Sequence, residues 1–199
     1  DVRHPYADLG IVPVQLPNML YPGGMGGWVD GVFYDYVLYT GNYQMAGIGG
    51  DEKKILVAGE ATILFTADVD FSGNSAGITI ATNASLAMYV SAANAKIAGQ
   101  GVINNTGRAT GFSYWGMPSN TSVKLQGNAD FTGSVYAPQA ALVLGGGGSA
   151  MDDFIGASVS ASVKMGGHFK FHYDESLGIY GPRRGYTINT WAEAEWQAL

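Results

Sequence analysis

Two histidines and an aspartate near the C-terminal end of the chain have the spacing of a metal site. His168, His172 and Asp174 are separated by even numbers of residues, so on a β-strand their side chains would share one face. Two imidazoles and a carboxylate can bind zinc or a similar ion. We favour the alternative interpretation, in which His172 and Asp174 hydrogen-bond to each other or to the backbone, and Asp174 or Glu175 caps a turn. On that interpretation the chain needs no cofactor.

Carboxylates elsewhere are candidates for calcium binding or for acid–base catalysis. Asp152 and Asp153 follow a run of glycines, and paired carboxylates can contribute to a calcium site, although a solvated turn is the simpler interpretation. A polysaccharide-processing enzyme would need two or three carboxylates close together, or a basic residue with calcium. The residues available for such a set are Asp68, Asp70, Asp130 and Lys124. Their positions do not group them, and because the sequence also lacks a phosphate loop, we expect a non-catalytic protein.

Aromatic residues offer a third kind of site, a surface that binds sugars or a partner protein. The segment 31–45 is rich in tyrosine and phenylalanine, and aromatic side chains are favoured at binding surfaces. The candidate ligand-binding residues are Tyr36, Tyr39, Trp28 and Trp115. The alternative, which we favour for the segment 31–45, is an N-terminal cap or first strand that covers the end of the core.

The elements that must position these residues are short strands. From about residue 50 onward, runs of β-forming residues alternate with Gly, Asn and Asp, which is typical of strands separated by tight turns. Three of the runs repeat one pattern, an apolar–x–apolar pair followed by Gly: 122–127, 141–146 and 162–167. Two further pairs of segments also match, 131–136 with 154–159 and, more weakly, 69–73 with 95–99.

Repeats of about 20 residues without a helix predict the coils of a β-solenoid. We therefore predict an all-β fold, a short right-handed parallel β-helix of roughly six coils, in which equivalent residues stack about 4.8 Å apart. The apolar residues expected to stack inside form two columns, Val123, Leu142 and Val163, and Leu125, Leu144 and Met165. The alternative is a β-sandwich, which does not need repeats in register.

The chain divides into three predicted parts. Residues 1–50 would form an irregular, aromatic-rich N-terminal cap, and residues 51–178 the parallel β-helix. Residues 179–199 would form a C-terminal extension with a short capping helix, because Thr190 and Glu193 have the spacing of a capping box. A helix this short must dock to be stable, either on its own core or on a partner, and we favour its own core.

Composition narrows the range of functions. The 199 residues include no Cys, which excludes disulfides and Cys-based metal sites, and 30 Gly, which suits tight corners. Only 13% of residues are charged, and the net charge is −6, so we expect no nucleic-acid partner. No apolar run is long enough for a membrane span.

Two motifs resemble a known kind of domain. The stretch 127–138 reads G-N-x-x-F-x-G-x-x-Y-A-P, and 172–177 reads H-Y-D-E-x-L. They resemble a domain of bacterial surface proteins and of PilX-type pilus-associated proteins, and the choice-of-anchor adhesin-type domains. The resemblance implies secretion, a β-helical fold and a structural or adhesive role, and it supplies no catalytic residues. The sequence lacks the N-terminal apolar helix that a pilin-like protein would carry.

From these observations we expect a non-catalytic structural or adhesive module, extracellular or at the cell surface of a bacterium. Its partners would be surface proteins, glycans, or further copies of itself, since uncapped solenoid ends can stack end to end. A carbohydrate-binding module and a polysaccharide-processing β-helix enzyme are the alternatives.

Overall fold

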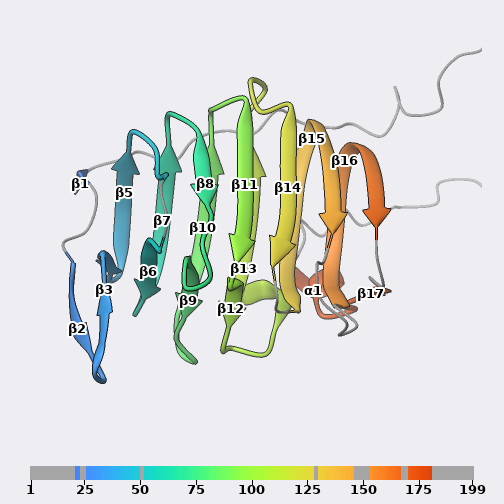
Figure 1. Cartoon of the computed structure of the whole chain (residues 1–199). Helices are drawn as coiled ribbons and strands as arrows, with labels where there is room; N and C mark the ends of the chain where they lie inside the picture. The colour runs from blue at the N-terminus through green and yellow to red at the C-terminus, as the bar shows by residue number, and fades with distance from the viewer. Residues whose placement is uncertain are drawn as a thin grey trace, which may run out of the picture.

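The protein is a β-solenoid of about five turns, seen in a computed structural model that describes residues 21–22, 26–49, 52–127, 130–145, 153–166 and 170–180. Its strands stack in parallel across successive coils, as Figure 1 shows. The predicted all-β parallel architecture is confirmed. Each of the first coils has three sides, which we name walls A, B and C.

Wall A begins with a marginal strand, β1 (Tyr21–Pro22), and contains the longest succession of parallel strands. Its strands are β5 (Gly41–Met45), β7 (Glu60–Phe65), β10 (Ser85–Val90), β13 (Phe112–Gly116), the first halves of β15 (Phe131–Gly145) and β16 (Asp153–Gly166), and β17 (Lys170–Tyr173).

Walls B and C complete the coil. Wall B contains β8 (Val69–Phe71), β11 (Asn94–Gly99), β14 (Ser122–Gly127) and the second halves of β15 and β16. Wall C contains β4 (Tyr36–Leu38), β6 (Lys54–Val57), β9 (Gly77–Ile80) and β12 (Gly101–Asn104). The remaining elements are an antiparallel hairpin of β2 (Gly27–Val29) and β3 (Val32–Tyr34), a 3-10 turn η1 (Ala109–Gly111) and a single helical turn α1 (Leu177–Tyr180).

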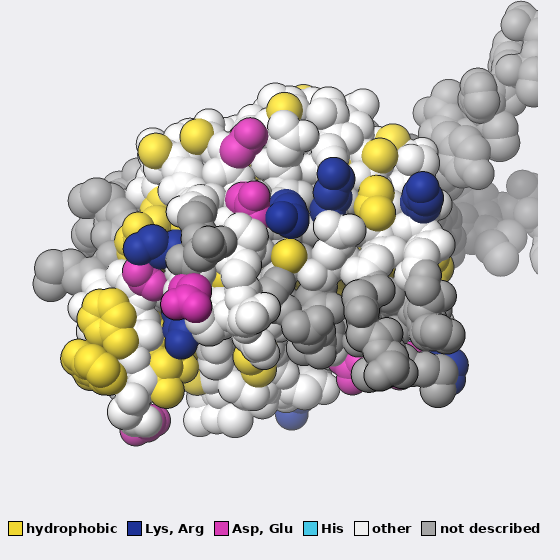
Figure 2. All heavy atoms as spheres, viewed as in Figure 1, with side chains coloured by type: hydrophobic (Ala, Val, Ile, Leu, Met, Phe, Trp, Pro, Cys, Tyr) yellow, Lys and Arg dark blue, Asp and Glu magenta, His cyan; other side chains and the backbone are white. Residues whose placement is uncertain are grey.

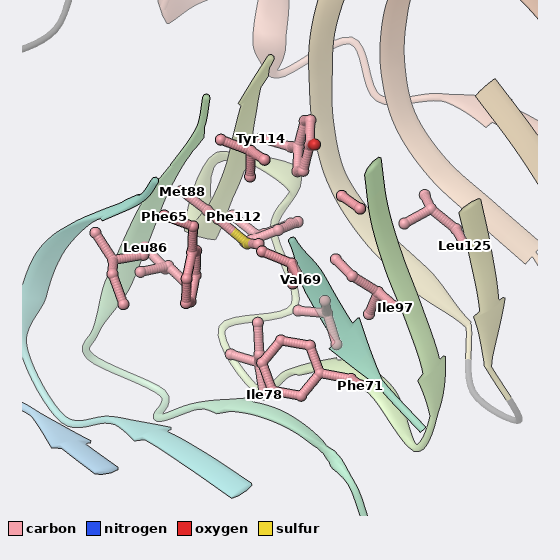
Figure 3. Packing of buried hydrophobic residues seen from close by; sticks show 14 of the residues in the cluster. Phe65, Val69, Phe71, Ile78, Leu86, Met88, Ile97, Phe112, Tyr114 and Leu125 are labelled. Carbon is pink, nitrogen blue, oxygen red and sulfur yellow. The ribbon is translucent and has the colours of Figure 1, made fainter. Parts of the chain in front are cut away.

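Alternation of side chains along each strand builds the core. In β10, every second residue from Leu86 to Val90 is buried, because successive side chains of a strand point to opposite faces. Figure 3 shows buried side chains from walls A, B and C, among them Met88, Ile97 and Ile78, pointing toward one another in the interior. Each buried side chain of this size contributes roughly 1.5–3 kcal/mol of hydrophobic stabilisation, so the stacked columns hold the coils together.

The predicted repeats lie in register. Val123 pairs with Leu142, which pairs with Val163. Phe131 pairs with Phe154, and the weaker upstream match is also correct, because Phe71 pairs with Ile97.

One part of the predicted stacking is wrong. Leu142 and Leu144 are buried, but Val163 is 49% and Met165 44% exposed. Both occupy inward positions on β16, and in the described part of the chain no wall-B strand follows β16 to cover them. The columns therefore continue to the last coil, but their burial ends one coil earlier than predicted.

Coil length varies while register is kept. The step is 20 residues from Tyr43 to Ile63, and 26 from Met88 to Tyr114, although each is a pair of register partners. Among the described residues, wall C has no strand after β12, and the step from Tyr114 to Val135 falls to 21 residues. The later coils are accordingly two-sided, with β15 and β16 each crossing from wall A to wall B.

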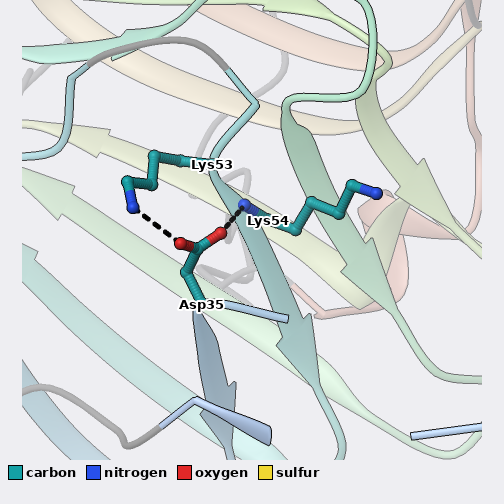
Figure 4. A network of polar contacts seen from close by, with 3 residues as sticks. All are labelled: Asp35, Lys53 and Lys54. Atoms are coloured by element: carbon teal, nitrogen blue, oxygen red, sulfur yellow. Dashed lines mark hydrogen bonds and ion pairs between the residues drawn. The ribbon is translucent and has the colours of Figure 1, made fainter. Parts of the chain in front are cut away.

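The solenoid starts earlier than the predicted boundary at residue 51. β4 and β5 already pair in parallel with β6 and β7. The Asp35 carboxylate joins these two coils, because it accepts hydrogen bonds from Lys53 Nζ at 2.7 Å and from the Lys54 backbone N–H at 2.9 Å (Figure 4). Partial burial raises the pKa of the Asp35 carboxyl, but these hydrogen bonds outweigh it and lower the pKa below its ordinary value.

Residues 1–20 and the predicted helix at 190–199 lie outside the described residues. Within the described ranges, no helix has the length and apolar character needed to cross a membrane.

Candidate functional site

The outward face of wall A carries two parallel columns of side chains, one of small residues and one of large residues. The small column, in register order, is Asn42, Thr62, Ala87, Ser113, Ser134 and Ala157. The large column, two residues further along each strand, is Gln44, Leu64, Tyr89, Trp115, Tyr136 and Val159. Because strands in register keep equivalent residues side by side, the difference in size between the two columns persists along the solenoid.

Three consecutive members of the large column form an aromatic row, Tyr89, Trp115 and Tyr136. The Tyr89 and Trp115 rings are stacked, with centroids 6.0 Å apart and planes at 13°. The Trp115 and Tyr136 rings lie 5.6 Å apart but are tilted by 50°. Trp115 Nε1 donates a hydrogen bond to Ser113 Oγ at 3.1 Å, so the indole is fixed against the small column. Burial raises the pKa of the Tyr89 hydroxyl above its ordinary value.

Two adjoining hollows, each of about 390 Å³, follow the small column along the wall and share Thr110 and Ser113. We name them together the wall-A groove. The first is lined by Thr110, Ser113, Trp115, Ser134, Val135, Tyr136, Ala157, Ser158, Val159 and Leu177. The second is lined by Asn42, Glu60, Ala61, Thr62, Ser85, Leu86, Ala87, Thr110 and Ser113.

The groove is aromatic and apolar at one end and richer in polar groups at the other. Its lining carries serine and threonine hydroxyls throughout, and among the described lining residues Glu60 is the only carboxylate. Such a surface can contact the apolar side of a ligand and hydrogen-bond its hydroxyl groups. It carries little charge with which to attract an ion.

The structure does not bring the four predicted aromatic residues together. Trp115 lines the groove, three rungs beyond the coil formed by β4 and β5. Trp28 is 74% exposed on the β2–β3 hairpin, where it packs edge-on against Phe33 at 5.6 Å. Tyr36 is half-buried and packs on the core, and Tyr39 is exposed in the link between β4 and β5.

The predicted metal residues are placed in other interactions. His172 lies 3.5 Å from the Asp153 carboxylate on the neighbouring strand. Asp174 accepts hydrogen bonds from the backbone N–H groups of Ser176 and Ala109, at 2.9 and 3.1 Å. Hydrogen bonding to Ser176 and then to Ala109 lowers the pKa of the Asp174 carboxyl. His168 lies outside the described residues, and within them no group of three metal-ligating side chains is assembled.

The other candidate carboxylates join neighbouring coils. Asp130 Oδ1 accepts a hydrogen bond from the Asp153 backbone N–H at 2.9 Å, and Asp70 lies 3.4 Å from Lys96 Nζ. Asp68 Oδ1 accepts from the Asn94 N–H at 3.4 Å. Asp152 lies outside the described residues. None of the described members of this set lines the wall-A groove.

Sequence reasoning found Trp115 but missed Tyr89 and Tyr136. The three aromatics are separated by 26 and 21 residues, so no fixed period relates them. The available signal was the repeat itself. Aligning 131–136 with the preceding coil, and not only with 154–159, would have placed Tyr136 beside Trp115.

The stretch from residue 38 to residue 180 matches the family described as Domain of unknown function (DUF7305). The chain belongs to this family. The match covers the walls from β5 to β17, the groove and α1, so the groove is part of the DUF7305 domain. Comparison with curated proteins and with solved structures finds no match.

Proposed function

We propose that this DUF7305 domain is a non-catalytic adhesive module of the bacterial exterior, which binds an extended, uncharged glycan along the wall-A groove. The observation that carries the proposal is the aromatic row beside a column of small, hydroxyl-bearing side chains. Location outside the cell is supported by the low charge and high glycine content, and by the resemblance to surface and pilus-associated domains.

A glycan fits the chemistry of the lining. Sugar rings present C–H groups that pack on aromatic side chains, and hydroxyl groups that pair with serine and threonine. Trp115 and Tyr136 supply the aromatic contact, while Ser134 and Thr110 supply hydroxyls. Because both hollows follow the rungs, which are about 4.8 Å apart, an elongated chain would contact several coils at once.

Binding is favoured over hydrolysis by the distribution of carboxylates. Glycoside hydrolysis normally uses two carboxyl groups on opposite sides of the scissile bond. The described lining of the groove carries Glu60 alone, at the end away from Trp115 and Tyr136. A chain held against the aromatic row would therefore be bound without being cleaved.

The proposal is tested by binding to an array of neutral oligosaccharides and polysaccharides, followed by titration of the best ligand. We expect Trp115→Ala and Tyr136→Ala each to weaken binding roughly 3- to 10-fold, the range expected for one lost aromatic contact. Trp28→Ala is the matched control, because it also removes an exposed tryptophan but outside the groove. Melting temperatures of all three variants would show that the fold is kept.

Two results would overturn the proposal. One is the absence of wild-type binding to every neutral glycan on the array. The other is loss of binding in Trp28→Ala with no change in Trp115→Ala, which would move the site to the N-terminal hairpin.

A further inference from the structure

The outward face of wall B carries a row of lysines. In register order, its central column is Asp70, Lys96, Lys124, Val143 and Lys164. Three of the six lysines of the chain therefore lie on one line. Figure 2 shows the dark-blue side chains following one another across the strands β11, β14 and β16. We name Lys96, Lys124 and Lys164 the lysine row.

The positive charges of the lysine row are only partly balanced by neighbouring carboxylates. Asp70 lies 3.4 Å from Lys96 Nζ, but Lys124 and Lys164 have no ion pair with any described residue. Lys96 and Lys124 are direct register partners, and like charges opposite each other on neighbouring strands are destabilising. In a protein of net charge −6, folding alone does not favour this arrangement, whereas an anionic ligand would.

The residues on either side of the row are mostly small. The outward neighbours on one side are Asn94, Ser122, Ala141 and Ser162, and on the other Ala98, Gln126, Gly145 and Gly166. Small side chains leave the ammonium groups accessible along the whole line, which spans three rungs, or roughly 14 Å. A linear ligand lying along the solenoid axis can therefore reach all three lysines.

We propose that the lysine row binds an acidic polysaccharide, a linear chain that carries carboxylates on successive sugar units. Single-stranded nucleic acid is less suited, because it needs aromatic side chains for base stacking, and the described outward residues of wall B include none. An anionic lipid surface is also less suited, because peripheral binding adds buried apolar anchors, and Val143 is the only apolar residue larger than alanine among these outward positions. The site is separate from the wall-A groove.

The experiment titrates the protein with oligogalacturonate, a linear chain of uronic acids, at low and at high salt. Lys124→Gln combined with Lys164→Gln is expected to weaken binding about 3- to 10-fold at low salt, and high salt should weaken wild-type binding. The matched control is Lys54→Gln combined with Lys170→Gln, which removes the same charge from walls C and A. It should weaken binding by less than about 2-fold.

Three outcomes would overturn the inference: no wild-type binding to oligogalacturonate at low salt, equal loss in both double variants, or equally tight lysine-dependent binding of a single-stranded oligonucleotide or of anionic vesicles. Binding of the neutral glycan should be unchanged in Lys124→Gln/Lys164→Gln, and oligogalacturonate binding unchanged in Trp115→Ala. Failure of one proposal is thereby distinguishable from failure of the other.

Discussion

Asn120 shows how a single polar residue shapes a corner of this solenoid. It lies between walls A and B of one coil and is fully buried. Its Nδ2 donates to the Ala92 carbonyl of the preceding coil at 2.9 Å, and its Oδ1 accepts from the Tyr114 hydroxyl at 3.0 Å. Burial raises the pKa of Tyr114 far above its ordinary value, so this hydroxyl is always a donor. The amide thus satisfies buried groups from two coils.

Replacing Asn120 with Ala should destabilise the protein by about 1–3 kcal/mol, because the Tyr114 hydroxyl and the Ala92 carbonyl would both be buried without a partner. Chemical denaturation gives the free energy of unfolding. Asn105→Ala is the control, since Asn105 is exposed in the link that follows β12, and it should change stability by less than about 0.5 kcal/mol. Equal effects of the two substitutions would show that the corner network does not stabilise the fold.

Among the elements, β15 and β16 are paired at one rung through two glycines, which leave no room for a side chain between them. Gly133 and Gly156 are register partners, and a Cβ at Gly156 would clash with the Gly133 carbonyl oxygen. Gly156 also has a φ of +152°, which side chains rarely adopt. The contact lies beside stacked Phe131 and Phe154, whose centroids are 4.7 Å apart.

Gly156→Ala should therefore cost about 2–4 kcal/mol, because it combines backbone strain with overpacking. Gly107→Ala separates the two causes. Gly107 has a φ of +66° but no atom within 4 Å of its Cβ position, so its substitution should cost only about 1–2 kcal/mol of left-handed strain. A Gly156→Ala protein as stable as wild type in thermal unfolding would refute the close approach of these strands.

The stacking register of wall B and of the last rungs of wall A was predictable from the sequence, whereas in wall C only individual strands were. The segments at 122, 141 and 162 align because each carries the same inward pair and a following Gly. The strands of wall C are only three or four residues long, and the links around them vary, so no shared motif marks them. The site was only partly predictable for the same reason, because Tyr89 and Tyr136 become neighbours of Trp115 only once the register is known.

For the whole molecule, burial depends on position along the stack. Each coil contacts mainly its two neighbours, so within the described part of the chain the last coil has a partner on one side only. Leu144 and Met165 occupy the same inward column, yet Leu144 is fully buried and Met165 is 44% exposed. Side-chain periodicity is identical at the two positions, which is why the sequence did not reveal this difference.

Leu144→Ala should destabilise the protein by about 2–5 kcal/mol, the usual cost of truncating a buried aliphatic side chain. Met165→Ala, the same kind of truncation one rung later, should cost less than about 1 kcal/mol. Midpoints of denaturation measured under one set of conditions would compare them directly. Similar losses in both variants would mean that the end of the stack is as well covered as its middle.

The unequal coil lengths make this scaffold tolerant of inserted sequence. The link from wall C to wall A is two residues between β4 and β5, four between β9 and β10, and seven between β12 and β13. The walls keep their pairing across all of these lengths. A peptide epitope grafted between Asn105 and Thr106 would therefore be displayed from a corner whose link length already differs from coil to coil. This makes the domain a platform for presenting loops at a fixed spacing.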